Sequence, residues 1–259
     1  YEVPSKNGIP QFWQRIPENE KQFKADFTLM KRAGSGDRYT ILMTADPQIR
    51  SRSARYDNFA FHSIDMYEDM CRDLRETAAS ITDRPVYGIS LGDLVWDNMP
   101  FHEVYKQRIR KIGVPVFQVI GNHDHNKAIT VDADADASFE AAFGPTYYSY
   151  NIGDCHFIVL DDVLYTGSSS YTADITDEQM AWLEQDLKYV PKDKLIIIGL
   201  HIATSRRNRP TSHVADYKEL YALLDGYNVR ILSGHSHNNY TTTISETIEE
   251  NTLGAVMGA

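Results

Sequence analysis

The chain has 259 residues, of which 42% are hydrophobic and 24% charged, and this ordinary globular composition excludes wholesale disorder and fibrous repeats. Its 36 acidic residues outnumber its 26 basic ones, for a formal net charge of -10, whereas proteins that bind nucleic acid non-specifically carry the opposite balance. No apolar run approaches the roughly 18 residues of a membrane span, and the longest comparable stretch, residues 195–203, is interrupted by His201.

The first 37 residues are predicted to form an N-terminal linker or arm, and residues 38–259 a single domain. Three prolines interrupt the polar N-terminal stretch, and Gly-Ser-Gly-Asp at residues 34–37 signals a turn before the domain. A short helix is expected over residues 19–31. The chain starts with Tyr1 rather than Met, and its last nine residues are typical of a buried strand cut short. We therefore expect the domain to be truncated at its C-terminus.

Within the domain, apolar strand-like runs alternate with amphipathic stretches, a pattern typical of α/β proteins. Apolar residues recur every three or four positions over residues 58–80, and Thr176 begins a capping-box pattern with Gln179. The expected helices cover residues 58–80, about 101–112, a segment from Ser138 and a segment from Thr176. The expected strands cover residues 39–45, 85–91, 114–120, 147–151, 155–160, 195–200, 229–233, 241–246 and 253–257.

Polar side chains follow five of the predicted strands, at the point where each strand ends. Each group alone is explained as an ordinary turn, a helix cap or a structural histidine. Together they combine carboxylate and amide oxygens with imidazole nitrogens, a mixed set that suits Mn, Fe or Zn better than Mg or Ca. Two histidines two residues apart lie on one side of an extended segment and can serve two adjacent ions. The five groups are Asp46-Pro47-Gln48, Gly92-Asp93, Gly121-Asn122-His123-Asp124, His201 and Gly234-His235-Ser236-His237.

In order and spacing, these five groups resemble the signature of the calcineurin-like metallophosphoesterases, which runs D-x-H, G-D, G-N-H-D/E, His and G-H-x-H. The resemblance covers residues 46–237, and Asp46-Pro47-Gln48 is similar to a D-P-Q variant of bacterial type. It implies the fold of that family, an α/β four-layer αββα sandwich of two mixed sheets with flanking helices.

The resemblance also implies a cofactor of two divalent or trivalent metal ions (Mn, Fe or Zn) that share Asp93 as a bridging carboxylate. Gln48 stands where the family most often has a histidine, and its neutral amide oxygen is a weaker ligand. By resemblance, the first metal takes Asp46, Gln48, Asp93 and His237, and the second takes Asp93, Asn122, His201 and His235.

The catalytic candidates are His123 and Asp124. A metal-bridging hydroxide is the implied nucleophile, since two close cations lower the pKa of a shared water, and His123 is the implied general acid. Asp97 and Asp124 are both candidates to support His123. Trp96 occupies the place of an aspartate found in the protein Ser/Thr phosphatases of this superfamily, which disfavours that class.

Two weaker features lie in loops. Arginines cluster after Gln48 and again after His201, and the second cluster is predicted to bind a substrate phosphate, with a solvated loop as the alternative. It comprises Arg206, Arg207 and Arg209. Residues 132–136 carry alternating aspartates but lack the glycine and glutamate that a calcium loop requires, so we expect a solvated loop there.

The predicted function is a dinuclear metal-dependent hydrolase of phosphate esters, with monoester and diester both open. The alternative is a non-catalytic, metal-containing module that binds a phosphorylated ligand. The expected partner is a small-molecule, glycan or nucleotide phosphate ester. The resemblance alone favours an exported protein, periplasmic or extracellular, and the sequence leaves the oligomeric state open.

Overall fold

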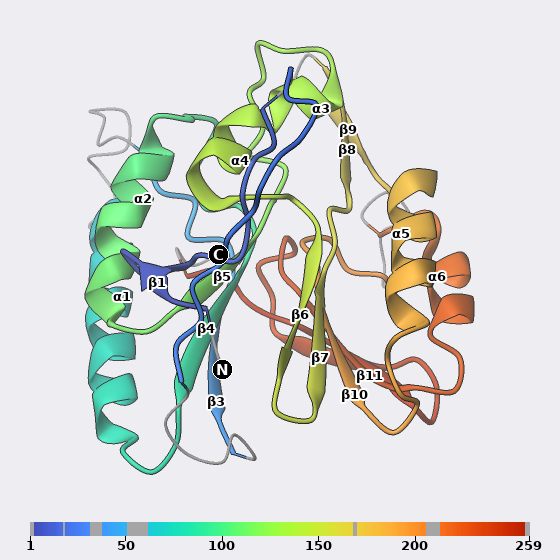
Figure 1. Cartoon of the computed structure of the whole chain (residues 1–259). Coiled ribbons are helices and arrows are strands. Elements are labelled where there is room, and N and C mark those ends of the chain that lie inside the picture. Colours follow the sequence, from blue (N-terminus) through green and yellow to red (C-terminus); the bar gives the residue numbers. More distant parts are fainter. Residues whose placement is uncertain are drawn as a thin grey trace.

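Two β-sheets face each other, and helices cover the outer face of each (Figure 1). The computed structural model describes residues 3–17, 19–31, 38–50, 62–167, 170–205 and 213–256. The smaller sheet has the order β3-β4-β5, with strands Thr40–Thr44, Val86–Leu91 and Val116–Val119. The larger has the order β12-β13-β11-β10-β7-β6, with strands Tyr240–Thr243, Ile248–Thr252, Asn228–Ser233, Leu195–Gly199, Cys155–Val159 and Tyr148–Ile152. This is the four-layer αββα sandwich that the resemblance implied.

The strand directions differ between the two sheets. Both described pairs of the smaller sheet, β3 with β4 and β4 with β5, are parallel. The larger sheet is mixed, because β7, β10, β11 and β13 pair in parallel while the outer strands β6 and β12 run antiparallel to their neighbours. The parallel strands of each sheet bring several carboxyl ends to one edge, where loops can gather side chains.

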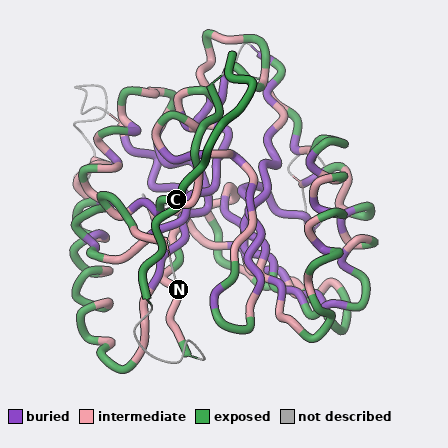
Figure 2. Tube along the Cα trace, in the orientation of Figure 1, coloured by how far each residue is buried: buried purple, intermediate pink, exposed green. Residues whose placement is uncertain are grey.

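The inner faces of the two sheets form a buried core. Ile89, Leu91 and Val119 of the smaller sheet pack against Val159 and Leu232 of the larger one. A Cβ added to Gly199 on β10 would lie 2.9 Å from the Ile89 side chain, so the side chains of the smaller sheet fill the space above this glycine. Figure 2 shows the buried residues concentrated between the layers.

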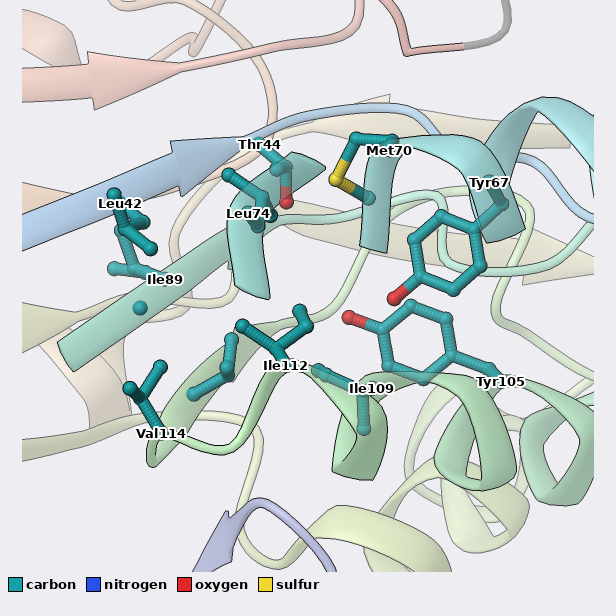
Figure 3. Close-up of a pocket in the computed structure, with 12 residues that line it drawn as sticks. Leu42, Thr44, Tyr67, Met70, Leu74, Ile89, Tyr105, Ile109, Ile112 and Val114 are labelled. Atoms are coloured by element: carbon teal, nitrogen blue, oxygen red, sulfur yellow. The ribbon is translucent and has the colours of Figure 1, made fainter. Parts of the chain in front are cut away.

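Helices α1 (Ser63–Ser80) and α2 (Phe101–Ile109), with the 3₁₀ turn η2 (Arg110–Ile112), cover the smaller sheet. The rings of Tyr67 on α1 and Tyr105 on α2 stack with their centroids 5.1 Å apart. Figure 3 shows Met70 and Leu74 of α1 lining a small pocket together with Ile109 of α2 and residues of the sheet. The cavity between them is only about 10 Å³, the lower limit for one water molecule, so this interface is packed rather than open to a ligand.

Helices α5 (Asp177–Leu187) and α6 (Tyr217–Leu223) cover the larger sheet, where Leu183 and Leu220 reach a core that includes Ile196 and Ile198. The Thr176 side chain accepts a hydrogen bond from the Gln179 amide, as the capping pattern predicted. The Gln179 side chain does not return to the cap. It exchanges two hydrogen bonds with the Asp161 backbone instead and so ties α5 to the end of β7.

The N-terminal segment packs across the edge of the sandwich. It forms the short hairpin β1 (Ser5–Lys6) and β2 (Ile9–Pro10), and the Gly8 carbonyl accepts from the Val116 amide of β5. Phe12 lies between Phe117 and Tyr148. The helix expected over residues 19–31 is wrong, since those residues form no helix and are all exposed. Without an apolar face to pack, a helix of this length is only marginally stable in water.

Two further expectations about elements are wrong. The last strand of the large sheet is β13 at Ile248–Thr252, whereas a strand was predicted over residues 253–257. The sequence analysis assigned no element to residues 247–252, where Glu250 is buried and its carboxylate accepts from the amides of Thr204 and Ser205. The stretch 132–136 is not a solvated loop. Asp132–Ala135 forms helix α3, which is followed by α4 (Ala137–Phe143), and Asp136 is buried.

Among the described helices, none is long and apolar enough to cross a membrane.

Candidate metal centre

The seven predicted ligands come together where strands of both sheets end. Asp46 and Gln48 follow β3, Asp93 follows β4 and Asn122 follows β5. From the larger sheet, His201 follows β10, and His235 and His237 follow β11. The first five are buried, and the last two are half-buried.

Asp93 lies at the middle of this cluster. Its Oδ2 accepts a 2.9 Å hydrogen bond from Gln48 Nε2, and its Oδ1 is 3.3 Å from His201 Nε2. Gln48 Nε2 is also 3.2 Å from His237 Nε2, which lies 3.4 Å from Asp46 Oδ1. Ligand atoms of Asp93, His201 and His235 all lie within 4.8 Å of one another, close enough to hold one ion.

Hydrogen bonds from outside the cluster orient the ligands. His201 Nδ1 donates to the Leu91 carbonyl at 2.8 Å, which leaves Nε2 facing Asn122 Oδ1 at 3.1 Å. Asp46 Oδ2 accepts from the His235 amide at 2.9 Å. A metal-binding histidine commonly donates its other ring N–H to a carbonyl or carboxylate in this way, because the bond fixes the tautomer and the ring plane.

Two buried oxygens in the cluster have no hydrogen-bond partner, Asp46 Oδ1 and Gln48 Oε1. Buried polar atoms are nearly always paired, because an unpaired one costs about 1–3 kcal/mol. Both atoms belong to predicted ligands of the same metal, so their lack of a hydrogen-bond partner fits residues that hold a cation.

The backbone at the strand ends is tightly turned. Asp46, Gln48, Asp93, His235 and His237 all have positive φ, between 42° and 63°. Such conformations are costly for residues with a Cβ and cluster at functional sites, where the surrounding structure enforces them. A Cβ at Gly121 would lie 2.2 Å from the Asp93 amide nitrogen, so only glycine allows these two loops to approach.

Burial and neighbouring charges shift the pKa values of several residues in the cluster. Burial by itself lowers the pKa of His201, but the carboxylates of Asp93 and Asp46 raise it to about 10. Burial likewise favours protonated Asp93, yet His201 and His123 hold the pKa of that carboxyl well below its usual range. Burial and the neighbouring His201 lower the pKa of His235 to about 3, which leaves it neutral and able to donate a lone pair.

His123 is held at the edge of the cluster. Its amide donates to Asp93 Oδ1 at 2.9 Å, and its Nε2 is 4.0 Å from Asp93 Oδ2. Its Nδ1 lies 2.7 Å from Asp97 Oδ1, which Lys127 Nζ also contacts at 2.7 Å. The ring stacks on Trp96 with centroids 4.1 Å apart. No sequence pattern singled out Lys127, and Trp96 had been noted only as a departure.

Asp124 has a different set of contacts. Its carboxylate accepts from the amides of Leu94, Val95 and Gly121 at 3.0–3.1 Å and lies 3.3 Å from His102 Nε2. These bonds join the loop after β5 to the loop after β4. Of the two carboxylates considered for His123, Asp97 is therefore the one that contacts its imidazole.

The arginines predicted to bind substrate, Arg206, Arg207 and Arg209, lie outside the described residues, so their role stays a prediction. Arg50, from the cluster after Gln48, has its guanidinium carbon 5.4 Å from the centroid of the Trp96 ring. One arginine is thus placed beside the aromatic ring that stacks on His123.

Comparisons with known proteins agree on the fold and the family. A model of the calcineurin-like phosphoesterases matches residues 39–239. A dimetal phosphatase from Danio rerio has a TM-score of 0.63 and 15% identity, over 85% of this chain and 88% of that one. Purple acid phosphatase PPD1 from yellow lupin (Lupinus luteus) seeds has a TM-score of 0.61 and 17% identity, over 84% of this chain and 44% of that one. A 5'-nucleotidase from Candida albicans has a TM-score of 0.50 and 15% identity, over 87% of this chain and 48% of that one.

This chain covers less than half the length of the lupin and Candida proteins. No curated protein matches it in sequence.

Proposed function

The chain belongs to the calcineurin-like phosphoesterase family, a family of metal-dependent phosphoester hydrolases, and from this premise we propose that it hydrolyses small organic phosphate esters at a dinuclear centre. The proposed ligands are those of the sequence-derived set: Asp46, Gln48, Asp93, Asn122, His201, His235 and His237.

One observation carries the proposal: oxygens and imidazole nitrogens of seven side chains at five strand ends converge, and two of the oxygens are buried without a hydrogen-bond partner. A purely structural polar cluster would satisfy its own atoms. When bound, two ions would supply Lewis acidity, which activates water as a nucleophile and neutralises phosphate oxygens.

His123 and its neighbours would supply the proton that the leaving oxygen needs. His123 Nδ1 faces the Asp97 carboxylate, so Nε2, beside the ligand cluster, is the nitrogen free to protonate the leaving oxygen. Lys127 holds the same Asp97 oxygen and limits its motion. Trp96 fixes the plane of the His123 ring by stacking. We propose that Asp97, rather than Asp124, is the carboxylate that orients His123.

Beside the ligand cluster, Arg50 lies against the half-buried ring of Trp96. Arg50 beside Trp96 suits a phosphate oxygen or an aromatic group on the ester. A 5'-nucleotidase and two phosphatases share the fold, which is compatible with nucleotide or sugar phosphates as substrates without selecting between them.

The test is turnover by metal-loaded protein with two pairs of esters. Protein stripped of metal and reloaded with Mn²⁺, Fe²⁺ or Zn²⁺ is assayed on p-nitrophenyl phosphate, bis-p-nitrophenyl phosphate and the corresponding methyl esters. Asp93→Asn should lose both ions and turnover. His123→Ala should keep the ions and lose roughly 10²–10⁴-fold in kcat, with the larger loss on methyl esters, because methoxide is a poor leaving group that needs a proton.

Two other outcomes would contradict the proposed function or the proposed role of His123. A wild-type protein that binds two ions per chain but turns over no ester would be the binding module considered above. A His123→Ala variant with equal losses on nitrophenyl and methyl esters would remove His123 from the role of general acid.

A further inference from the structure

A second group of metal-binding side chains lies outside the centre described above. His125 follows the loop of His123, Asp132 is on α3, and Asp136 lies between α3 and α4, near β8 (Val163–Gly167) at the top of Figure 1. One potential ligand atom from each of the three side chains lies within 4.8 Å of the others. His125 is 0% exposed and Asp136 6% exposed, while Asp132 is half-buried.

The orientation of His125 is fixed by its surroundings. Its Nδ1 lies 3.0 Å from the Gly121 carbonyl, which can only accept, so this nitrogen carries a proton. The Tyr165 ring stacks on the imidazole with centroids 5.5 Å apart, and the Tyr165 amide donates to Asp132 Oδ1. The imidazole therefore aims its other nitrogen, Nε2, at the two aspartates, as a metal-binding histidine with an outer-shell carbonyl does.

The contact between His125 and Asp136 is close but is not a hydrogen bond. His125 Nε2 and Asp136 Oδ1 are 2.9 Å apart, yet neither atom has a hydrogen-bond partner. With Nε2 unprotonated, two electron-rich atoms lie close together with no proton between them. With Nε2 protonated, the oxygen lies off the axis of the N–H. A spacing of about 3 Å is what two neighbouring ligands adopt around one ion with bonds of about 2.1 Å.

The cavity that Asp132 and Asp136 line is acidic. It has a volume of about 230 Å³, and its lining contains Asp132, Asp136 and Asp161 but no lysine, arginine or histidine. Burial and the neighbouring Asp136 charge raise the pKa of Asp161 to about 8 although His125 opposes them, so one imidazole faces several carboxylates whose buried charges are costly. A bound cation would remove that cost.

We propose that His125, Asp132 and Asp136 bind one divalent transition-metal ion, separate from the dinuclear centre. An imidazole with two carboxylates suits Zn²⁺ or Mn²⁺ and disfavours Ca²⁺, which takes oxygen ligands. Through the bond from His125 Nδ1 to the Gly121 carbonyl, this ion would steady the loop that carries Asn122 and His123.

The test counts ions in protein variants loaded with Zn²⁺ alone or Mn²⁺ alone. After gel filtration, elemental analysis should give three ions per chain for the wild type and two for Asp136→Asn. Glu178→Gln is the matched control, because it removes one negative charge from the same cavity at an exposed position, and it should keep three. The double variant Asp46→Asn/Asp93→Asn, which removes carboxylates of the dinuclear centre, should keep one.

A second readout does not depend on the count. In the Asp46→Asn/Asp93→Asn protein, Zn²⁺ should shift the ¹⁵N resonance of His125 Nε2 and raise the melting temperature, and added Asp136→Asn should abolish both effects. Since neither measurement uses turnover, failure of the hydrolase proposal leaves this test intact.

The proposal is overturned if the wild type and Asp136→Asn bind the same number of ions, or if Zn²⁺ leaves the His125 resonance unmoved. The cluster would then be a buried ion pair between His125 and Asp136.

Discussion

At the scale of single residues, Asp97 and Asp124 were both candidates to support His123, and their contacts in the structure distinguish them. Asp97 is exposed and touches His123 and Lys127, whereas Asp124 is fully buried and accepts backbone hydrogen bonds. Lys127 and His123 hold the pKa of Asp97 below its usual range although burial opposes them, so Asp97 stays ionised. Asp97 thus contacts the His123 imidazole, whereas Asp124 joins the loops after β4 and β5 through backbone hydrogen bonds.

Exchanging each carboxylate for an amide tests this division. Asp97→Asn should lower kcat about 10–100-fold, because His123 loses its ionised partner, with metal content, KM and melting temperature nearly unchanged. Asp124→Asn should instead lower stability by about 1–3 kcal/mol, because a buried carboxylate that accepts from three amides is replaced by a group with one acceptor oxygen. Steady-state kinetics and urea unfolding measure the two effects. A larger kinetic loss in Asp124→Asn than in Asp97→Asn contradicts the assignment.

Buried carboxyls also predict how the metal-free protein responds to pH. Burial raises the pKa of Asp161 to about 8 and of Asp162 to about 7. Their folded-state pKa values exceed the unfolded ones, so the stabilisation that their protonated forms give is complete below about pH 4 and is lost as the pH rises through 7 and 8. His125, whose pKa Asp136 raises to about 9 against the effect of burial, acts in the same direction.

We therefore expect the free energy of unfolding of chelator-treated protein to fall from about pH 4 to about pH 9, because the two carboxyls bind extra protons in the folded state between about pH 4 and 8 and His125 does so between about pH 6.5 and 9. Urea unfolding at several pH values checks this, and Asp161→Asn, which keeps an oxygen for the Val163 amide, should flatten the decline. A stability that rises over this interval, or an unchanged slope in Asp161→Asn, is the contrary result.

At the scale of elements, the strand ends were easier to predict than the loops that join them. Ile89 and Leu91 on β4, like Ile196 and Ile198 on β10, lie in apolar runs whose ends are visible in the sequence. β13 was missed because Glu250 and its neighbours carry charge, and only the distant amides that Glu250 accepts from explain why a charged strand is buried. The contacts of Lys127 and His125 likewise depend on residues distant in sequence, which no local pattern records.

The loop after β5 gives a prediction about glycine. Gly121→Ala would bring a Cβ against the amide and carboxylate of Asp93, both closer than any real Cβ contact, so the loops must separate. We expect loss of metal binding together with activity, measured by elemental analysis and turnover. Gly113→Ala is the control: it has a positive φ of 84° but nothing within 4 Å of the added Cβ. It should cost about 1 kcal/mol and leave the ions in place. Equal metal loss in both variants would rule out the clash as the cause.

At the scale of the whole molecule, the N-terminal segment contributes to the core although composition alone marks it as an arm. Phe12 packs on Phe117 and Tyr148, while Phe23, further along the same segment, is 39% exposed. Phe12→Ala should lower the free energy of unfolding by about 1–3 kcal/mol, and Phe23→Ala should change it by less than about 0.5 kcal/mol. Chemical denaturation measures both. Equal effects would mean that the segment does not pack on the sheets in solution.

Only the resemblance predicted that two sheets would pack face to face. The periodicity of apolar residues indicates strands and helices, but it does not indicate which strands become neighbours. Strand order such as β13 beside β11, with β12 outside, is decided by long-range packing. The seven residues that the resemblance implies as ligands nevertheless lie close together, because their motifs follow strands whose ends meet at one shared edge.

At this edge, the proposed oxygen ligands and the proposed nitrogen ligands come from different sheets. Every carboxylate and amide ligand comes from the loops of β3, β4 and β5, and every imidazole comes from those of β10 and β11. An ion bound by both kinds of donor would therefore link the two sheets, and its binding free energy would include the cost of holding them together at this edge. We therefore expect chelation to weaken the packing between the two sheets at this edge as well as to remove activity, so that metal concentration and the free energy of unfolding vary together.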